Sequence, residues 1–140
     1  MLPRAHTTLV VADYDEAIAF FTEKLLFQLA EDTPQTSEKR WVVVTPPPQV
    51  VGANMLLAKA ATPSQKQAIG QQTGGRVAFF LYTSIFSTYY AHLVQAGVHI
   101  ARTPVQQPYG QVAVFSDLYG NLWDLIEPAT LSESSLPPFP

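Results

Sequence analysis

Three side chains along the chain, His6, Arg76 and Asp124, are of types that can bind or transform a small molecule. The imidazole of His6 can act as a general base, because its ordinary pKa lies close to neutral pH. The alternative for His6 is a hydrogen-bonded structural histidine packed beside Arg76 and Asp124. No nucleophile is identified beside it, which favours the structural role.

Arg76 admits two interpretations. Its guanidinium can hold a carboxylate, a phosphate or an enolate through paired hydrogen bonds, and it can stabilise developing negative charge. Alternatively, Arg76 forms an internal salt bridge with Asp124 that keeps their two strands in register, which is the interpretation we favour. Both roles are compatible if a ligand displaces Asp124 from the guanidinium.

Large apolar side chains are further candidates, as walls of a binding site: Trp41, Leu57, Phe80, Tyr109 and Phe115. Because side chains alternate along a strand, Arg76 and Phe80 share one face, whereas Trp123 points away from Asp124 into the core or against a helix. Tyr109 stands in a Pro-Tyr-Gly segment, a loop setting that favours a place at the rim. Ordinary core packing is the alternative for each.

The first half of the chain predicts a strand, a helix and three further strands. Residues 6–11 are β-branched and apolar, and Asp13 precedes Glu16 by three residues, which predicts the start of a helix of roughly three to four turns. The apolar face of that helix comprises Ala17, Ile18, Phe21 and Leu25. The later elements are a short strand near 27–30, a polar loop over 32–39, and strands over 40–45 and 54–59 joined through prolines 46–48 and Gly52.

The pattern begins again after a linker over 62–75 that is rich in Gln, Ser and Thr. A strand over 76–83 precedes a helix over 84–96, whose apolar face comprises Phe86, Tyr90, Leu93 and Val94. Gly97 fits the position just past this helix, where a positive φ favours glycine. Strands over 98–101, 110–116 and 121–127 follow, and residues 129–140 form a Ser/Pro-rich tail in which Leu136 and Phe139 can dock on a neighbour.

The order βαβββ, linker, βαβββ predicts an α+β fold made by duplication, with a curved mixed sheet around one small-molecule cup. His6 and Arg76 then occupy equivalent positions at the start of the two halves, and Leu57 and Asp124 do so near the end. A chance likeness between two ordinary amphipathic helices is the alternative. We predict one domain over 1–128, in which modules 4–60 and 76–128 are joined by linker 61–75.

The composition limits the class of protein. The chain of 140 residues suits a single domain, and its 47% apolar and 14% charged residues argue against disorder. A formal net charge of −3 provides no basic surface for nucleic acid. No segment has the pattern of a signal peptide or a membrane span, and the absence of cysteine excludes disulfides and thiolate chemistry, so we expect a cytoplasmic protein.

The helix patterns and the closing segment together resemble a known family. The residues that carry the resemblance are 10–13, 17–21, 25–27, 96–98 and above all 115–127, with the sequence Phe-Ser-Asp-Leu-Tyr-Gly-Asn-Leu-Trp-Asp-Leu-Ile-Glu. They are similar to the vicinal oxygen chelate superfamily, which includes glyoxalase I, bleomycin-resistance proteins, fosfomycin-resistance enzymes and extradiol dioxygenases. The resemblance extends to about residue 128 and implies paired βαβββ modules and a homodimer.

The resemblance also implies a metal site that this sequence matches only in part. Metal-dependent members place a histidine on the first strand and an acid on the last strand of each half. His6 and Asp124 match two of these positions, whereas Arg76 and Leu57 occupy the other two. A guanidinium cannot ligate a cation, and a divalent ion needs about three or four protein donors. We therefore predict no bound metal, with His6 and Asp124 as residual ligand positions.

Three functions remain, in this order of preference. The first is a metal-free protein that binds a small anionic or aromatic molecule, which needs only an aromatic-walled cup and one or two polar anchors. The second is a metal-independent isomerase or lyase in which Arg76 is the electrophile and His6 the base. The third is a metal-dependent lyase or dioxygenase, whose missing ligands come from water, substrate or a partner subunit.

Overall fold

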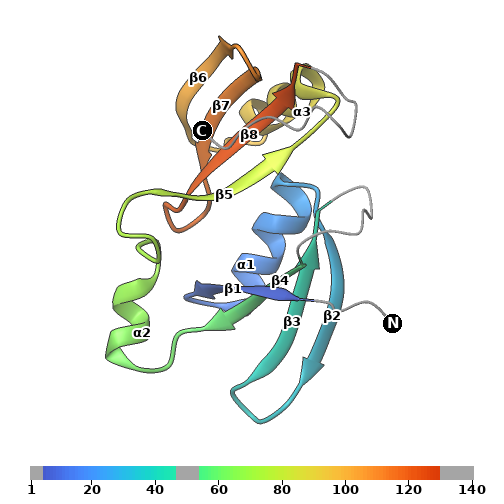
Figure 1. Cartoon of the computed structure of the whole chain (residues 1–140). Helices are drawn as coiled ribbons and strands as arrows, with labels where there is room; N and C mark the ends of the chain where they lie inside the picture. The colour runs from blue at the N-terminus through green and yellow to red at the C-terminus, as the bar shows by residue number, and fades with distance from the viewer. Residues whose placement is uncertain (1–4, 47–53, 130–140) are drawn as a thin grey trace. The chain divides into compact units, whose positions relative to one another are not determined.

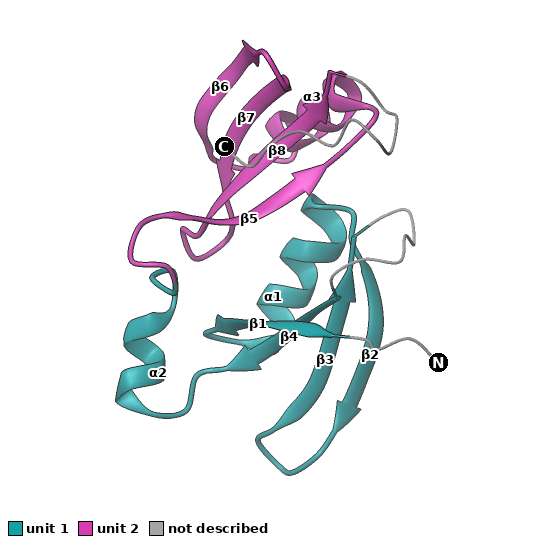
Figure 2. Cartoon of the chain, viewed as in Figure 1, with its two compact units in different colours: residues 1–72 teal, residues 73–140 magenta. Residues whose placement is uncertain are grey.

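The computed structural model describes residues 5–46 and 54–129. The chain divides into two compact units, residues 1–72 and 73–140, and each is described here on its own (Figure 2). The boundary falls inside the linker predicted over 61–75. The connection over 47–53 and the tail, including Leu136 and Phe139, lie outside the described residues.

Each unit is built around a four-stranded mixed sheet with the same internal order (Figure 1). In unit 1 the order is β1-β4-β3-β2, and in unit 2 it is β5-β8-β7-β6. The first strand of each unit runs parallel to the last, and the remaining pairs are antiparallel. The predicted α+β fold of two βαβββ modules is therefore confirmed.

The strands of unit 1 are β1 (His6–Val11), β2 (Gln28–Pro34), β3 (Arg40–Thr45) and β4 (Asn54–Lys59). Its first helix, α1 (Tyr14–Ala19), continues as a π-helical segment, η1 (Phe20–Lys24). The Asp13 side chain accepts a hydrogen bond from the Glu16 amide at 2.9 Å, as the capping pattern predicted. Behind that cap, Ala17, Phe21 and Leu25 are fully buried.

The strands of unit 2 are β5 (Val77–Tyr82), β6 (Ile100–Gln107), β7 (Gly110–Ser116) and β8 (Leu122–Pro128). Helix α3 (Phe86–Gln95) is followed, as predicted, by Gly97 just past its C-cap, and the φ of Gly97 is +80°. The Gly97 and Val98 amides donate to the carbonyls of Val94 and Leu93, which closes the helix with a Schellman motif.

The apolar face of α3 differs from the prediction at two positions. Tyr89 is buried beside Phe86 and Leu93, whereas the side chain of Val94 is 51% exposed. The helix begins at Phe86 rather than at residue 84, and its sheet-facing side is set by Phe86, Tyr89 and Leu93, three and four residues apart.

Two edge strands extend beyond their predicted ends. β2 continues to Pro34, because two side chains of β3 hold its acidic residues: the Arg40 guanidinium donates a hydrogen bond to Asp32, and the Trp41 indole donates one to Glu31. The sequence pattern predicts a loop for residues 32–39. β6 continues to Gln107, and its pairing with β7 shifts between Arg102 and Val105, around Pro104. A proline is tolerated at such an irregular place on an edge strand.

The segment predicted as a plain linker contains a short helix, α2 (Pro63–Ala68). Thr62 and Gln65 form a reciprocal capping box, and Pro63 occupies the first turn, where its missing amide hydrogen costs nothing. These are ordinary helix-start residues, but this helix within the linker was not predicted from the sequence.

A buried turn leads into β8. Both carboxylate oxygens of Asp117 (Oδ1 and Oδ2) accept hydrogen bonds from the side chain of Asn121, Oδ1 also from the backbone amides of Tyr119 and Asn121, and Oδ2 from the Trp123 indole. Gly120 has a φ of +96° within this turn. The Asp-Leu-Tyr-Gly-Asn segment thus fixes the start of the strand that carries Asp124.

Candidate functional site

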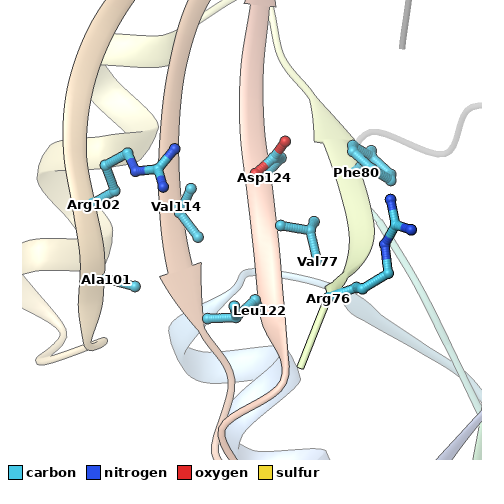
Figure 3. Close-up of a pocket in the computed structure, with 8 residues that line it drawn as sticks. All are labelled: Arg76, Val77, Phe80, Ala101, Arg102, Val114, Leu122 and Asp124. Carbon is cyan, nitrogen blue, oxygen red and sulfur yellow. The ribbon is translucent and has the colours of Figure 1, made fainter. Parts of the chain in front are cut away.

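Unit 2 contains a cavity of about 360 Å³ on one face of its sheet (Figure 3). Its lining residues come from all four strands and from the residue that precedes β5: Arg76, Val77, Phe80, Ala101, Arg102, Val114, Leu122 and Asp124. The volume is that of a typical small-molecule pocket. The cavity therefore contains two of the three predicted polar residues, Arg76 and Asp124.

Strand pairing brings the lining residues together. Asp124 in the middle of β8 pairs with Phe80 on β5 and with Val114 on β7. Paired residues of neighbouring strands point to the same face of a sheet, so these three side chains form one row across it. Arg102 continues the row on β6, because it pairs with Val114.

Asp124 is the buried acid of this cavity. The residue is 6% exposed, and burial raises the pKa of its carboxyl above the ordinary value of 3.8, while the charge of Arg102 acts in the opposite direction. Within residues 5–46 and 54–129, no side chain or backbone amide donates a hydrogen bond to the Asp124 carboxylate.

The predicted salt bridge between Arg76 and Asp124 is not formed. In the part of the chain that the structure describes, no ion pair within 4 Å joins Arg76 to Asp124, whereas Arg40 forms ion pairs with Asp15 and Asp32. Figure 3 shows why: the Arg76 guanidinium extends toward Phe80, and Arg102 lies on the other side of Asp124. Arg76 precedes β5 and is exposed to solvent, where a charged side chain gains little free energy from an ion pair.

Two residues of this region, Arg102 and Tyr82, were not predicted from the sequence. Arg102 fell just past a strand predicted to end at residue 101. Tyr82 lies two residues after Phe80 on β5, and its pKa is raised by burial and by the nearby charges of Asp124 and Tyr109. Extending the strand alternation from Phe80 would have found Tyr82, whereas the bulged course of β6 left no comparable pattern for Arg102.

Among the predicted wall residues, Phe80 lines the cavity and is 38% exposed. Tyr109 stands in the turn between β6 and β7, where it is half-buried, and it is not among the residues that line the cavity. Phe115 does not line the cavity. It pairs with Trp123 across β7 and β8, the two rings stack with centroids 5.7 Å apart, and both residues are buried on the opposite face from Asp124.

The remaining predicted residues belong to unit 1. The His6 ring meets the Trp41 ring edge-on, with centroids 6.0 Å apart, and the Trp41 indole donates to Glu31. Trp41 borders a broad depression of about 1320 Å³ in this unit. Leu57 borders it too, but its side chain is fully buried together with its strand partners Leu9 and Val42. A fully buried side chain offers a ligand no surface, so we assign Leu57 to the core.

The side chains within either unit do not fit a divalent metal ion. In the described ranges, no three or more His, Asp, Glu or Cys residues gather as such an ion requires. The cavity of unit 2 contributes one carboxylate and two guanidiniums, and the guanidiniums repel a cation. His6 lies beside Trp41 in unit 1, and the other side chains of its strand β1 are threonine, leucine and valine, which are not typical ligands of a divalent metal ion.

Comparison with known proteins gives the family. The model of the Glyoxalase/Bleomycin resistance protein/Dioxygenase superfamily matches residues 4–125. The chain belongs to this superfamily. The resemblance inferred from the helices and the closing Asp-x-x-Gly-Asn segment is therefore confirmed, and the fold of the superfamily accounts for the repeated strand order.

Individual relatives are similar over most of their length. An uncharacterized protein of Shewanella frigidimarina strain NCIMB 400 is 53% identical over 123 residues, which cover 87% of this chain and 90% of the relative. The crystal structure of UcmS2 has a TM-score of 0.75 at 31% identity, covering 90% of this chain and 98% of UcmS2. TnmS3, an antibiotic binding protein from Streptomyces sp. CB03234, has a TM-score of 0.73 at 26% identity, covering 92% of this chain and 98% of TnmS3.

None of the helices within residues 5–46 and 54–129 has the length and hydropathy needed to span a bilayer.

Proposed function

We propose that this member of the superfamily binds a small aromatic anion in the cavity of unit 2, without a tightly bound metal ion. The observation that carries the proposal is the pair of guanidiniums, Arg76 and Arg102, on the two sides of a cavity with an aromatic wall. Arginine is suited to the planar carboxylate, sulfonate or enolate of such a ligand.

The aromatic part of the ligand would pack against Phe80. This ring is partly exposed although it is large and apolar, which is the state expected of a side chain that a ligand covers. Tyr82 extends the same wall along β5, two residues after Phe80. The volume of about 360 Å³ suits a ligand of one to three rings.

The relatives support a binding role. TnmS3 is an antibiotic binding protein with a TM-score of 0.73 to this chain. At 26% identity this likeness supports a binding role, and the chemistry of the ligand is argued from the side chains of this chain. The metal-free form of the proposal rests on the poor fit of the cavity residues to a cation. The homodimer that is common in the superfamily is part of the proposal.

A titration with matched aromatic probes tests the binding role. Isothermal titration calorimetry at pH 8 would compare 2-naphthoate and 2-naphthalenesulfonate with the neutral 2-naphthamide. The proposal expects binding of the two anions, with at least tenfold weaker binding of the amide, and a loss of about tenfold for Arg102→Ala, since a hydrogen bond to a charged group contributes about 1.5 kcal/mol or more. Equal affinity for acid and amide would contradict it.

The control for this variant is Arg40→Ala in unit 1, whose guanidinium is bound to Asp15 and Asp32. It removes a positive charge of the same size outside the cavity, so it should leave the affinity unchanged. Metal analysis of untagged protein tests the metal-free part separately. Near-stoichiometric zinc, nickel, manganese or iron would overturn it, and light scattering at micromolar concentration would test the dimer.

A further inference from the structure

Asp124 has no role in the capture of an anion, and its place in the cavity requires an explanation. Its carboxylate lies in the row that links Phe80 and Arg102 across the sheet, and it repels the acidic group that the two guanidiniums attract. The neighbouring members of the row on β5 and β7, Phe80 and Val114, cannot donate hydrogen bonds from their side chains.

The carboxylate is therefore a strong acceptor without a donor from the described part of the protein. An ionised carboxylate has about four acceptor sites, and a buried polar group that loses its hydrogen bonds is costly. In the open cavity water can serve these sites. A ligand that fills the cavity displaces that water, so its own groups decide whether the carboxylate remains satisfied.

We propose that Asp124 is a specificity-determining residue that selects, among aromatic acids, those that also carry a hydroxyl or amino group to donate to its carboxylate. The ligand class is then a hydroxylated or amino-substituted aromatic acid. This inference rests on the proposed function, because the guanidiniums supply the binding of the acid and Asp124 only discriminates.

The discrimination follows from the unequal cost of the two kinds of ligand. A hydroxyl placed at Asp124 replaces the displaced water, whereas an ether oxygen or a bare ring edge leaves the buried carboxylate unpaired. A hydrogen bond to a charged group corresponds to about a 10- to 100-fold difference in affinity. The charge of Arg102 favours the ionised carboxylate, but its guanidinium lies beyond ion-pair distance from Asp124 and so does not replace the lost hydrogen bond.

The test uses 2-naphthoates with a hydroxyl at ring position 5, 6 or 7, each paired with its methyl ether. Calorimetric titration at pH 8 keeps the carboxyl groups of the probes ionised. We expect the wild-type protein to bind at least one hydroxy compound about tenfold or more tightly than its ether. Asp124→Leu should bind the hydroxy compound and the ether equally while it still binds unsubstituted 2-naphthoate.

Two further variants separate the possible failures. Asp124→Asn keeps a neutral hydrogen-bond acceptor of the same shape, so it should prefer the hydroxy compound over its ether by only a few fold. This variant tests the role of the carboxylate if Asp124→Leu does not fold. Arg102→Ala should weaken every naphthoate by a similar factor and leave the ratio of hydroxy compound to ether unchanged.

The outcomes are distinguishable. If no naphthoate binds the wild-type protein, the proposed function fails. If naphthoates bind but every hydroxy compound matches its ether, or if the preference survives in Asp124→Leu, the assignment of Asp124 is wrong while the proposed function stands.

Discussion

The indole Nε1 of Trp123 donates a hydrogen bond to Oδ2 of Asp117 over 3.1 Å, and both residues are buried. The bond joins the turn after β7 to the strand β8 that carries Asp124. Asp117 also accepts from the amide of Asn121 and from its side chain. A single carboxylate therefore organises the turn, which explains why the closing segment contains an acid that does not line the cavity.

Asp117→Ala should lower the free energy of unfolding by about 3 kcal/mol, because it leaves several buried donors without an acceptor. Urea denaturation followed by circular dichroism would measure the change. Trp123→Phe removes one hydrogen bond from the same carboxylate and keeps most of the ring that stacks on Phe115, so about 1 kcal/mol is expected. A similar loss for both variants would show that the packing of the indole, rather than the turn, carries the stability.

The fold could be predicted from the sequence to the extent that local patterns decide it. Asp13 and Gly97 mark helix ends through hydrogen bonds and a positive φ that depend on their own residue types. The charged strand β2 could not be recognised, since its extended form is fixed by Arg40 and Trp41 on the neighbouring strand. Edge strands depend on their partners more than on their own composition.

The site was predicted less well than the fold. Arg76 and Asp124 do line one cavity, but the guanidinium reaches toward Phe80, because the chain bends at Arg76 before β5 begins. Arg102 enters the cavity from a strand whose pairing shifts on both sides of it. A bulge changes which face the following side chains occupy, and no pattern of alternating residues announces it.

The side chain of Gln72 occupies the free edge of β1. Its Oε1 accepts from the Val10 amide at 2.6 Å, and its Nε2 donates to the Thr8 carbonyl at 3.0 Å, as a neighbouring strand would do. Gln72→Ala should therefore speed hydrogen exchange at the Val10 amide about fivefold or more and lower stability by about 1 kcal/mol. Exchange followed by NMR would measure it. Gln71→Ala is the control, since the side chain of this exposed neighbour makes no described contact with β1.

A carboxylate from β8 caps helix α3. The helix begins after Ile85, whose side chain cannot accept a hydrogen bond, and Oε1 of Glu127 accepts from the Phe86 amide at 3.1 Å. Glu127→Ala should cost about 1 kcal/mol of unfolding free energy, whereas Glu127→Gln should cost less because its amide oxygen can still accept. Thermal unfolding of the three proteins would compare them. Equal stability of all three would mean that water replaces this cap.

The pH dependence of stability should reveal the buried state of Asp124. Because burial raises its pKa in the folded protein, the folded state holds the proton to a higher pH than the unfolded chain does. Ionising the buried carboxyl therefore lowers the stability of the folded protein. This loss is absent below the ordinary pKa of 3.8, grows as the pH rises toward the raised pKa, and is constant above it. Asp124→Asn should be more stable than the wild type by about 1 kcal/mol at pH 7, with the gain vanishing below pH 3.8.

Asp32 gives the matched experiment of opposite sign. Its hydrogen bond to Arg40 lowers its pKa, so its contribution to stability is present above the ordinary pKa and is lost as the pH falls through the lowered one. Asp32→Asn should therefore be less stable than the wild type at pH 7, and this deficit should shrink on acidification. Melting temperatures of the three proteins between pH 3 and pH 8 would give both curves. If the two variants changed in the same direction with pH, the carboxyl of Asp124 would have a donor from the protein in solution, and its assignment as an acceptor without such a donor would be wrong.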